Sequence, residues 1–384
     1  MTSQAAPLIA IVAGEASGDN LGAALIAAIR ERVPNARFIG VPGPRMREVG
    51  CEALASSEEL AVMGLIEILR HLPRLFSLRR RLLRELRARR VDVFIGIDAP
   101  EFNLGMARRL KAHGIRTVQY VSPQVWAWRQ GRVHEIGEAC DRILCLLPFE
   151  PAFYERHGIA ARFVGHPLAD QFPLQSDRLA AREALGLPES GEIVAILPGS
   201  RVGEVTRLAS PFAGAAAWLA ARRPGVRFVA PMASAATRER FEAEWQRCGS
   251  QTPVTVVDGR SREVLAAADV VLVASGTATL ETLLTRRPMV VAYRLGAITA
   301  FLLQSLGLVK VRFFSQPNLL VGREVVPEFF QARANPETLG RALLEWLVEP
   351  ARWANLEQEF AEVHLALRRD GAALAAQAVI ELLP

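Results

Sequence analysis

Two stretches of the chain follow the same pattern: LIAIVAGEASGD at residues 8–19 and IVAILPGSRVGE at residues 193–204. In each, an apolar run typical of a buried strand leads into a glycine-bearing loop and then into a helical stretch. Such a unit directs the unpaired N–H groups of the helix start toward whatever lies above the loop, and these groups suit an anion such as a phosphate. Two units half a chain apart predict an α/β fold of two Rossmann-like, doubly wound domains that face one cleft, which favours a nucleotide-dependent enzyme.

Apolar runs alternate with helical patterns through both halves, which predicts parallel sheets covered by helices on both faces. Strands are expected at residues 8–13, 37–41, 91–97, 117–121, 143–147 and 162–164 of the first half, and at 193–197, 227–231, 254–257, 270–273 and 289–292 of the second. Helices are expected at residues 20–32, 60–89, 102–113 and 128–138, between the strands of the second half, and from residue 336 onward.

The domain boundary is expected within residues 165–190, which hold three prolines and several polar residues before a short helix. We therefore expect a first domain over residues 1–168 and a second over residues 169–350. A helical tail would follow over residues 351–384, and tails of this kind often pack back on the first domain.

The composition describes a globular chain with a basic balance. Its 384 residues are too many for one ordinary core, 51% are hydrophobic and 22% are charged, and the formal net charge is +6. This charge favours acidic partners such as nucleotides, phosphorylated lipids or an anionic membrane surface. Nucleic acid is not expected as a partner, because the arginines are scattered and no recognition module is visible.

Neither a metal nor another cofactor is expected. The four cysteines, Cys51, Cys140, Cys145 and Cys248, show no metal-ligand spacing, and no Asp-x-Asp motif or His/Asp cluster is visible. Free cysteines, the lack of a signal-peptide pattern and the lack of a long apolar window predict a reduced, cytoplasmic protein without a membrane span.

The stretch VMGLIEILRHLPRLFSLRRRLLRELR at residues 62–87 is dense in leucine and then in arginine, and Pro73 is expected to break it. An apolar face beside a cationic face suits the surface of an anionic bilayer, and the alternative is a core helix with a solvated basic side. A second apolar region, residues 297–314, could form part of a lipid-lined wall.

Asp98 follows the apolar run VDVFIGI, at the expected carboxyl end of a buried strand, where ligands bind in open α/β sheets. A partly desolvated carboxylate has a raised pKa that suits a general base. The alternative is a helix cap, because Asp98 precedes Ala99 and Pro100.

The two glycine-bearing loops differ in charge. In the first, Glu15 would repel a phosphate, so this loop is expected to face the uncharged or acceptor side, with Ser17 or Asp19 capping the helix that follows. In the second, Ser200 and Arg201 lie where a pyrophosphate would meet a helix N-terminus, and arginine is a bidentate phosphate partner.

A third loop, VASGTATLE at residues 273–281, again places small residues between a strand and a helix. Glu281 could accept hydrogen bonds from two ribose hydroxyls, and the alternative is an ordinary glutamate favoured by the helix dipole. Trp126 and Trp128 could line a sugar or acyl site, although packing is their commoner role. For His166, a neutral, packed histidine is expected.

Eight strings carry a resemblance to a known family: GEASGD at 14–19, GIDAPEFN at 96–103, SPQVWAWR at 122–129, LPFE at 147–150, FVGHPL at 163–168, LPGSR with Glu204 at 197–204, SGTATLE at 275–281 and PNLL at 317–320. In this order, over almost the whole chain, they resemble the lipid-A-disaccharide synthases. The resemblance implies an inverting, metal-independent glycosyltransferase with the two-domain GT-B fold.

The resemblance also implies the reaction. UDP-2,3-diacylglucosamine would donate its sugar to 2,3-diacylglucosamine 1-phosphate, giving a β-1,6-linked disaccharide 1-phosphate and UDP in lipid A biosynthesis. The enzyme would attach peripherally to the cytoplasmic face of the inner membrane. A homodimer is plausible, because the C-terminal region exchanges between two subunits in some members of the family.

Under this resemblance each candidate residue receives a role. Asp98 would take the proton of the acceptor 6-hydroxyl, with Glu15 as the alternative base, and Glu15 and Ser17 would face the acceptor sugar. The UDP-sugar side would comprise Ser200, Arg201, Glu204, Ser275, Gly276, Thr277, Glu281 and Asn318. The membrane would meet Leu65, Ile66, Leu69, Leu72, Leu75 and Phe76.

Two other functions compete with this one. A UDP-N-acetylglucosamine 2-epimerase shares the two-domain architecture, and it would need acid and base groups around the sugar ring but no lipid-facing surface. A non-catalytic peripheral membrane protein would keep the basic charge but would not require Asp98.

Overall fold

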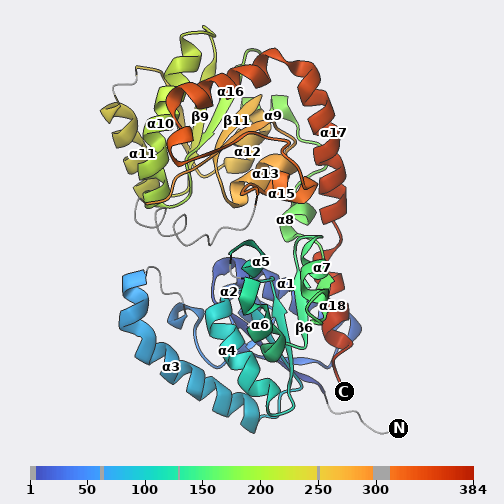
Figure 1. Ribbon diagram of the computed structural model, residues 1–384. Coiled ribbons are helices and arrows are strands. Elements are labelled where there is room, and N and C mark those ends of the chain that lie inside the picture. The colour runs from blue at the N-terminus through green and yellow to red at the C-terminus, as the bar shows by residue number, and fades with distance from the viewer. Residues whose placement is uncertain (1–5, 61–64, 129, 249–250, 297–311) are drawn as a thin grey trace. The chain divides into compact units, whose positions relative to one another are not determined.

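The chain forms two compact α/β units. The computed structural model describes residues 6–60, 65–128, 130–248, 251–296 and 312–384 (Figure 1). One unit comprises Met1–Asp170 together with Leu367–Pro384, and the other comprises Gln171–Ala366. The first connection thus falls inside the stretch where the boundary was expected. The predicted tail differs, because residues 351–366 belong to the second unit and only the last 18 residues return to the first.

A seven-stranded sheet with the order β3-β2-β1-β4-β5-β6-β7 forms the centre of the first unit, and all its strand pairs are parallel. The strands are β1 (Leu8–Ala13), β2 (Arg37–Val41), β3 (Glu52–Ala53), β4 (Val93–Ile97), β5 (Arg116–Tyr120), β6 (Arg142–Cys145) and β7 (Ala161–Phe163). The chain leaves β1 for β2 on one side and later returns to β4 on the other. Ligand sites of doubly wound sheets lie at such a reversal.

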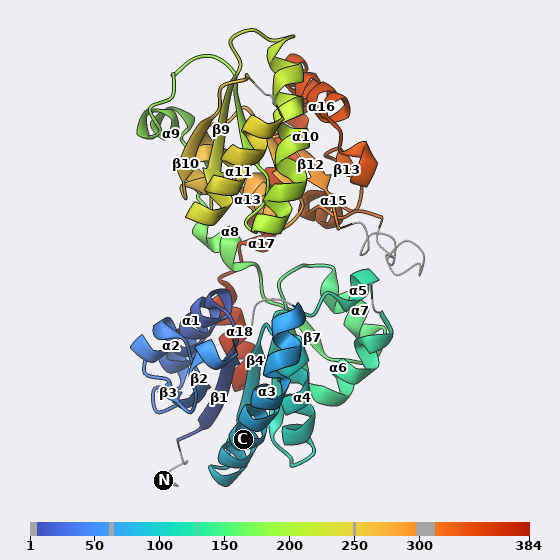
Figure 2. The same cartoon turned by 90° about the vertical axis from the view of Figure 1, so that its left-hand side faces the viewer.

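Helices cover both faces of this sheet (Figures 1 and 2). They are α1 (Ala16–Arg32), α2 (Pro44–Glu48), α3 (Leu65–Ala88), α4 (Pro100–Lys111), α5 (Val125–Trp128), α6 (Val133–Ala139), α7 (Glu150–Glu155) and α18 (Gly371–Ile380). The short helix α8 (Pro167–Gln171) lies in the connection to the second unit. Alternate residues of β1 serve the two faces: Ile9 and Ile11 join the core beneath α1 and α18, whereas Ala10 and Val12 join the core beneath α3 and α4. Because both faces are buried, an uninterrupted apolar run is what this strand requires.

The expected break of α3 at Pro73 is wrong, because the helix runs through this residue from Leu65 to Ala88. A proline removes one backbone hydrogen bond. The turns that follow are held by Leu78, Leu82 and Leu86, which are 3%, 0% and 0% exposed and lie on one stripe in the core. Burial of this stripe outweighs the local cost of the proline.

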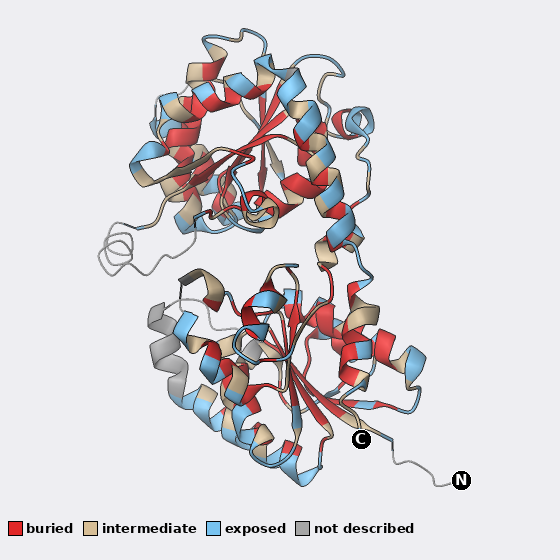
Figure 3. Cartoon of the chain, turned by 45° about the vertical axis from the view of Figure 1, so that its right-hand side comes forward, coloured by how far each residue is buried: buried red, intermediate tan, exposed pale blue. Residues whose placement is uncertain are grey.

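The second unit repeats the arrangement with a six-stranded parallel sheet of order β10-β9-β8-β11-β12-β13. Its strands are β8 (Ile193–Leu197), β9 (Arg227–Met232), β10 (Thr255–Asp258), β11 (Val270–Ala274), β12 (Met289–Tyr293) and β13 (Glu328–Phe330). Its helices are α9 (Arg178–Ala184), α10 (Val202–Ala220), α11 (Ala235–Arg247), α12 (Ser261–Ala267), α13 (Thr277–Leu284), α15 (Gln316–Val321), α16 (Pro336–Val348) and α17 (Pro350–Leu367). Buried residues gather along the strands of both sheets (Figure 3).

Both chain connections are tied to one another inside the first unit. The backbone N–H of His166 donates to the carbonyl of Leu367 over 2.9 Å, and the Asp170 carboxylate accepts the backbone N–H groups of Asp370 and Gly371 over 3.3 and 3.1 Å. Glu381, just beyond α18, forms ion pairs with Arg142 and Arg162. The C-terminal segment is therefore an integral part of this unit.

Candidate active site

Asp98 lies directly after β4, in the left-handed region with φ +51°, and Ala99 follows it with φ +39°. This backbone costs about 1–2 kcal/mol per residue for an amino acid with a side chain. The N-cap of α4 is Ala99, and no side chain caps this helix. The helix-cap alternative for Asp98 is therefore wrong, and its carboxylate is not consumed by the start of α4.

The half-buried carboxylate of Asp98 faces the first glycine-bearing loop. Oδ2 accepts a hydrogen bond of 3.4 Å from the Ser17 hydroxyl. Burial, with a further contribution from the negative charge of Glu15, raises the pKa of Asp98 to about 6, and the Ser17 hydrogen bond opposes the shift. Gly14 allows the two loops to approach, since a Cβ at this position would lie 3.0 Å from that of Ala99. The structure thus brings Glu15, Ser17 and Asp98 together.

The expectation that Ser17 or Asp19 caps α1 is wrong. The helix begins earlier than predicted, with Glu15 as its N-cap, so both residues lie in its first turn. Asp19 is 4% exposed and accepts the backbone N–H groups of Arg45 and Met46 over 2.8 and 3.0 Å. It therefore fixes the start of the neighbouring helix α2.

In the second unit, Glu204 fills the loop where an anion was expected. Its Oε2 accepts the backbone N–H groups of Ser200 and Arg201 over 3.2 and 3.4 Å. Gly199, with φ +121°, makes the room, since a Cβ there would lie 2.6 Å from that of Glu204. These amides are occupied by the protein's own carboxylate. Arg201 is the N-cap residue of α10; its guanidinium is 83% exposed and forms an ion pair of 3.3 Å with Oε1 of Glu204.

The start of α13 is open. Its N-cap, Gly276, has φ +153°, and a Cβ there would meet nothing within 4 Å. Thr277 is exposed, and the first-turn N–H groups of a helix have no partner within the helix. Ser275 holds the adjoining loop through a hydrogen bond of 2.7 Å from Oγ to the carbonyl of Phe314. One turn further, burial raises the pKa of Glu281, against the effect of Arg262.

Asn318 does not join these residues at the surface. It is 0% exposed; its Oδ1 accepts the backbone N–H groups of Val325 and Val326 over 2.7 and 3.0 Å, and its Nδ2 donates to the Val326 carbonyl and to Glu328. The amide is used inside the domain. The role suggested for it from the resemblance, orienting the pyrophosphate or the acceptor, thus receives no support from its position.

One group that shapes this edge of the second sheet was not predicted from the sequence. Glu328, on the unpredicted strand β13, accepts the backbone N–H groups of Phe314 and Ser315 over 3.0 and 2.9 Å. The rings of Tyr293, Phe314 and Phe330 lie 6.0 Å from one another. Burial, with a further contribution from the charge of Glu204, raises the pKa of Tyr293, and Arg207 and Arg201 oppose this shift. The sequence signal that could have pointed to this edge is Tyr293, a tyrosine at the end of the apolar run at residues 289–292.

A hydrogen bond between Trp126 and Glu150 connects two of the stretches that carry the resemblance, residues 122–129 and 147–150. The Trp126 indole N–H donates to Glu150 Oε1 over 3.1 Å, and the backbone N–H of Leu147 donates to Oε2 over 3.0 Å. Glu150 is 3% exposed, and burial raises its pKa to about 7. Trp126 also packs edge-to-face on Phe149 at 4.9 Å. This tryptophan is therefore locked by packing, while the side chain of Trp128 lies outside those described.

His166 is a half-buried residue of the first connection. Burial lowers its pKa to about 4, and its Nδ1 accepts the backbone N–H of Leu168 over 3.2 Å. Both observations agree with the neutral, packed histidine that was expected.

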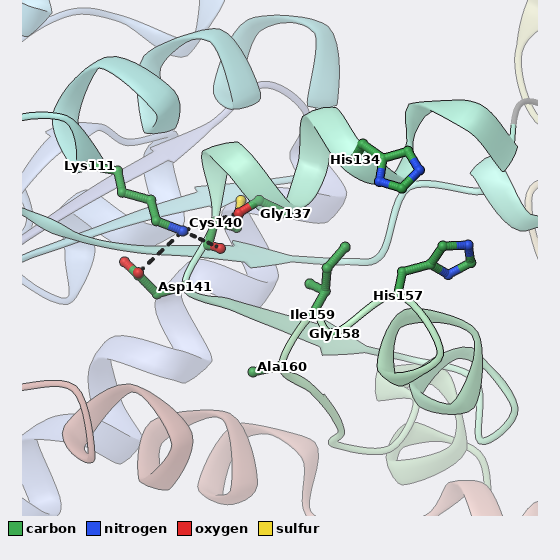
Figure 4. A pocket seen from close by; sticks show the side chains of 9 residues that line it. All are labelled: Lys111, His134, Gly137, Cys140, Asp141, His157, Gly158, Ile159 and Ala160. Atoms are coloured by element: carbon green, nitrogen blue, oxygen red, sulfur yellow. Dashed lines mark hydrogen bonds and ion pairs between the residues drawn. The ribbon is translucent and has the colours of Figure 1, made fainter.

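A cavity of about 400 Å³ lies elsewhere in the first unit, between Lys111, His134 and His157 (Figure 4). It contains none of the predicted site residues. The Lys111 ammonium donates to the carbonyls of Gly137 and Cys140 over 3.1 and 2.8 Å and lies 3.3 Å from Asp141. Lys111 thus satisfies the C-terminal end of α6, where a cation is favoured.

Of the six predicted membrane-contact residues, the structure describes the side chains of Leu75 and Phe76. The side chains of Leu65, Ile66, Leu69 and Leu72 lie outside those described, as do residues 297–311. Leu75 is half-buried, and Phe76 is 50% exposed with the Arg79 guanidinium 4.8 Å from its ring. Among the described helices, none has the length and apolar character to span a bilayer. Within the same residues, no three His, Cys, Asp or Glu side chains form a group that could hold a metal ion.

Comparison with solved structures gives the fold. A calicheamicin glycosyltransferase, CalG4, matches with a TM-score of 0.60 at 14% identity, covering 99% of this chain and 98% of that one. The UDP-GlcNAc 2-epimerase from Neisseria meningitidis bound to UDP-GlcNAc matches with a TM-score of 0.62 at 10% identity, covering 97% and 98%. At these identities the matches establish the fold alone: two parallel-sheet units of this kind form the GT-B fold, which the glycosyltransferase and the epimerase share.

Comparison with sequences gives the family. The family model described as lipid-A-disaccharide synthetase matches residues 9–381. The lipid-A-disaccharide synthases of Pseudomonas paraeruginosa and Alkalilimnicola ehrlichii are 53% and 54% identical over 374 residues, with 97% of each chain covered. That of Xanthomonas campestris pv. campestris is 48% identical over 381 residues, covering 98% of this chain and 86% of that one. The chain belongs to the lipid-A-disaccharide synthase family and is a glycosyltransferase of lipid A biosynthesis. The epimerase alternative is not favoured.

Proposed function

We propose that the protein transfers 2,3-diacylglucosamine from its UDP derivative to 2,3-diacylglucosamine 1-phosphate. The products are the β-1,6-linked disaccharide 1-phosphate and UDP. The observation that carries this proposal is Asp98: its carboxylate lies at the carboxyl end of β4, is not used as a helix cap, and has a pKa raised to about 6. A base of this pKa is ionised at neutral pH and still takes up a proton readily.

Asp98 acts on the acceptor. It accepts the proton of the 6-hydroxyl as that oxygen attacks the anomeric carbon of the donor sugar. The bond from the anomeric carbon to the phosphate oxygen breaks, its electron pair leaves with UDP, and the configuration inverts. Glu15, the N-cap of α1, and Ser17, in the first turn of this helix, lie against the acceptor sugar.

The donor's diphosphate binds at the start of α13. Gly276 and Thr277 leave this helix end open, whereas Glu204 already occupies the amides of Ser200 and Arg201. The carboxyl ends of β8 and β11 meet at one edge of the sheet because the strands are parallel neighbours. The exposed Arg201 guanidinium therefore neutralises the charge that develops on UDP, and Glu281 accepts hydrogen bonds from the ribose hydroxyls.

The diacylated substrates bring the enzyme to the membrane. The basic stretch of α3 and the exposed Phe76 support peripheral attachment to the anionic, cytoplasmic face of the inner membrane. An assembly of two copies, expected from the resemblance, stays a prediction.

Mass spectrometry of the products tests the proposal. The purified protein is incubated with UDP-2,3-diacylglucosamine and 2,3-diacylglucosamine 1-phosphate, singly and together. We expect UDP and the disaccharide 1-phosphate only with both substrates. UDP release without a disaccharide, or an epimerised sugar nucleotide, would contradict the proposal, and membrane binding without turnover would favour a non-catalytic role.

A further inference from the structure

Two buried side-chain amides donate hydrogen bonds to the backbone carbonyl of Asp98. Asn103, on α4, is 0% exposed, and its Nδ2 donates to the Asp98 carbonyl over 2.9 Å. Gln119, on β5, is 1% exposed, and its Nε2 donates to the same carbonyl over 3.1 Å. One carbonyl oxygen thus receives two buried donors, which use both of its lone pairs.

The same two amides join three strand ends. Asn103 Nδ2 also lies 3.4 Å from the Val12 carbonyl of β1 and 3.2 Å from the Ile97 carbonyl of β4. Gln119 Nε2 lies 3.3 and 3.4 Å from the carbonyls of Tyr120 and Val121, where β5 ends. These contacts tie the loop of Asp98 to the edge of the sheet on both sides.

Gly96 makes room for this pair. A Cβ at Gly96 would lie 2.6 Å from the Cβ of Asn103 and 3.0 Å from Oε1 of Gln119. Any larger residue at this position of β4 would displace the amides. The string GIDAPEFN therefore encodes a glycine, a carboxylate and an amide that fit together around one turn.

The turn that they hold is unfavourable by itself. Asp98 and Ala99 have φ +51° and +39°, and Val121, after β5, has φ +72°. Residues with side chains, and β-branched ones above all, persist in this region only where their surroundings impose it. The left-handed backbone at Asp98 turns the chain into α4 and leaves the carboxylate against Ser17.

We propose that Asn103 and Gln119 are positioning residues for the transfer reaction. By holding the Asp98 carbonyl, they keep its carboxylate at the place where the acceptor hydroxyl is deprotonated. The inference rests on the proposed role of Asp98 as the base. Asn103 and Gln119 themselves lie beneath the turn and touch no substrate.

A double-mutant cycle tests the inference. Asn103→Leu and Gln119→Met keep the approximate side-chain size but remove the donors, and each is made in the wild type and in Asp98→Asn. We expect each to lower kcat about tenfold to a hundredfold in the wild type, because small displacements of a catalytic group are costly. In Asp98→Asn neither should lower kcat further, since there is no base left to position. KM for the donor and the affinity for UDP should stay within twofold.

A control separates positioning from loss of stability. Thr117, also on β5 and 0% exposed, donates from its hydroxyl to the Ala139 carbonyl over 2.8 Å, away from Asp98. Thr117→Val should lower the melting temperature while leaving kcat within twofold. If Asn103→Leu does not fold, Gln119→Met carries the test through the other donor to the same carbonyl.

The outcomes are distinct. Wild-type kcat in both folded variants would overturn the inference, as would an equal fall in kcat in the wild-type and Asp98→Asn backgrounds. An Asp98→Asn variant with wild-type kcat would instead overturn the proposed base, whatever the effect of Asn103.

Discussion

The Ser17 hydroxyl, in the first turn of α1, donates to Oδ2 of Asp98 over 3.4 Å, and the two residues follow the neighbouring strands β1 and β4. This contact lowers the pKa of Asp98, while burial and the charge of Glu15 raise it. The carboxylate that we propose as the base thus lies between two side chains with opposite effects on its ionisation. Each can be removed by one substitution.

The pH dependence of kcat/KM should report these effects. With a pKa of about 6, Asp98 becomes protonated as the pH falls through that value, so activity should fall on the acid side. Ser17→Ala removes a bond to the charged form and should move the acid limb to higher pH. Glu15→Gln removes a repelling charge and should move it to lower pH, less so at high salt because Glu15 is exposed.

Shifts of both variants in the same direction would contradict this assignment. Ser190→Ala and Glu239→Gln offer matched changes at exposed positions outside the predicted site, and their profiles should follow the wild type.

The ionised carboxylate of Asp98 should lower the free energy of unfolding at neutral pH. Its folded pKa of about 6 exceeds its ordinary value of 3.8, so the native state binds the proton more tightly and loses stability as the pH rises from about 4 through 6. Asp98→Asn removes this loss and should raise the free energy of unfolding by up to about 3 kcal/mol at pH 8. The gain should shrink below pH 4 in urea unfolding curves. An equally large gain at pH 3.5 and pH 8 would refute the electrostatic cause.

Arg201 should contribute to affinity for UDP but not to stability. Its side chain is 83% exposed, so Arg201→Ala should change the free energy of unfolding by less than about 0.5 kcal/mol. Loss of a charge-assisted phosphate contact should weaken UDP binding about tenfold or more in calorimetry. Arg222→Ala is the control, because Arg222 lies over the Trp218 ring beyond the other end of α10. Unchanged UDP affinity in Arg201→Ala would remove the phosphate role.

Phe76 should contribute to vesicle binding. It is 50% exposed on a basic helix, so Phe76→Ser should reduce sedimentation with anionic vesicles by removing apolar area from the bilayer. Leu179→Ser is a matched control, since Leu179 is 57% exposed on α9 of the other unit. Equal sedimentation of Phe76→Ser and the wild type would contradict the role of Phe76, and equal losses in both variants would indicate a non-specific effect.

The long buried strands were predictable because a short, continuous apolar run favours a strand that is buried on both faces. The runs at residues 8–13, 37–41 and 193–197 became β1, β2 and β8 with the expected bounds. The short edge strands β3 and β13 were missed, whereas the similarly short edge strand β7 was expected at residues 162–164. The course of α3 was also missed, since the stripe of Leu78, Leu82 and Leu86 outweighs Pro73 only when its burial is known.

The candidate site was predictable where the topology alone places a residue. A carboxylate at the end of a central strand must reach the ligand edge of the sheet, which is how Asp98 was selected. The partners of Glu204, Asn318 and Asp19 depend on how loops fold back on themselves, and the spacing of residues does not encode this. Gly96, Asn103 and Gln119 come from three elements, and only their packing relates them to Asp98.

The turnover of Asp98→Asn, measured together with its affinity for UDP, tests the role of the base most directly. We expect kcat to fall by about 10²–10⁴, the usual contribution of a general base, while UDP binds as tightly as to the wild type. A folded Asp98→Asn enzyme that keeps more than a tenth of the wild-type kcat would show that another group takes the proton of the acceptor.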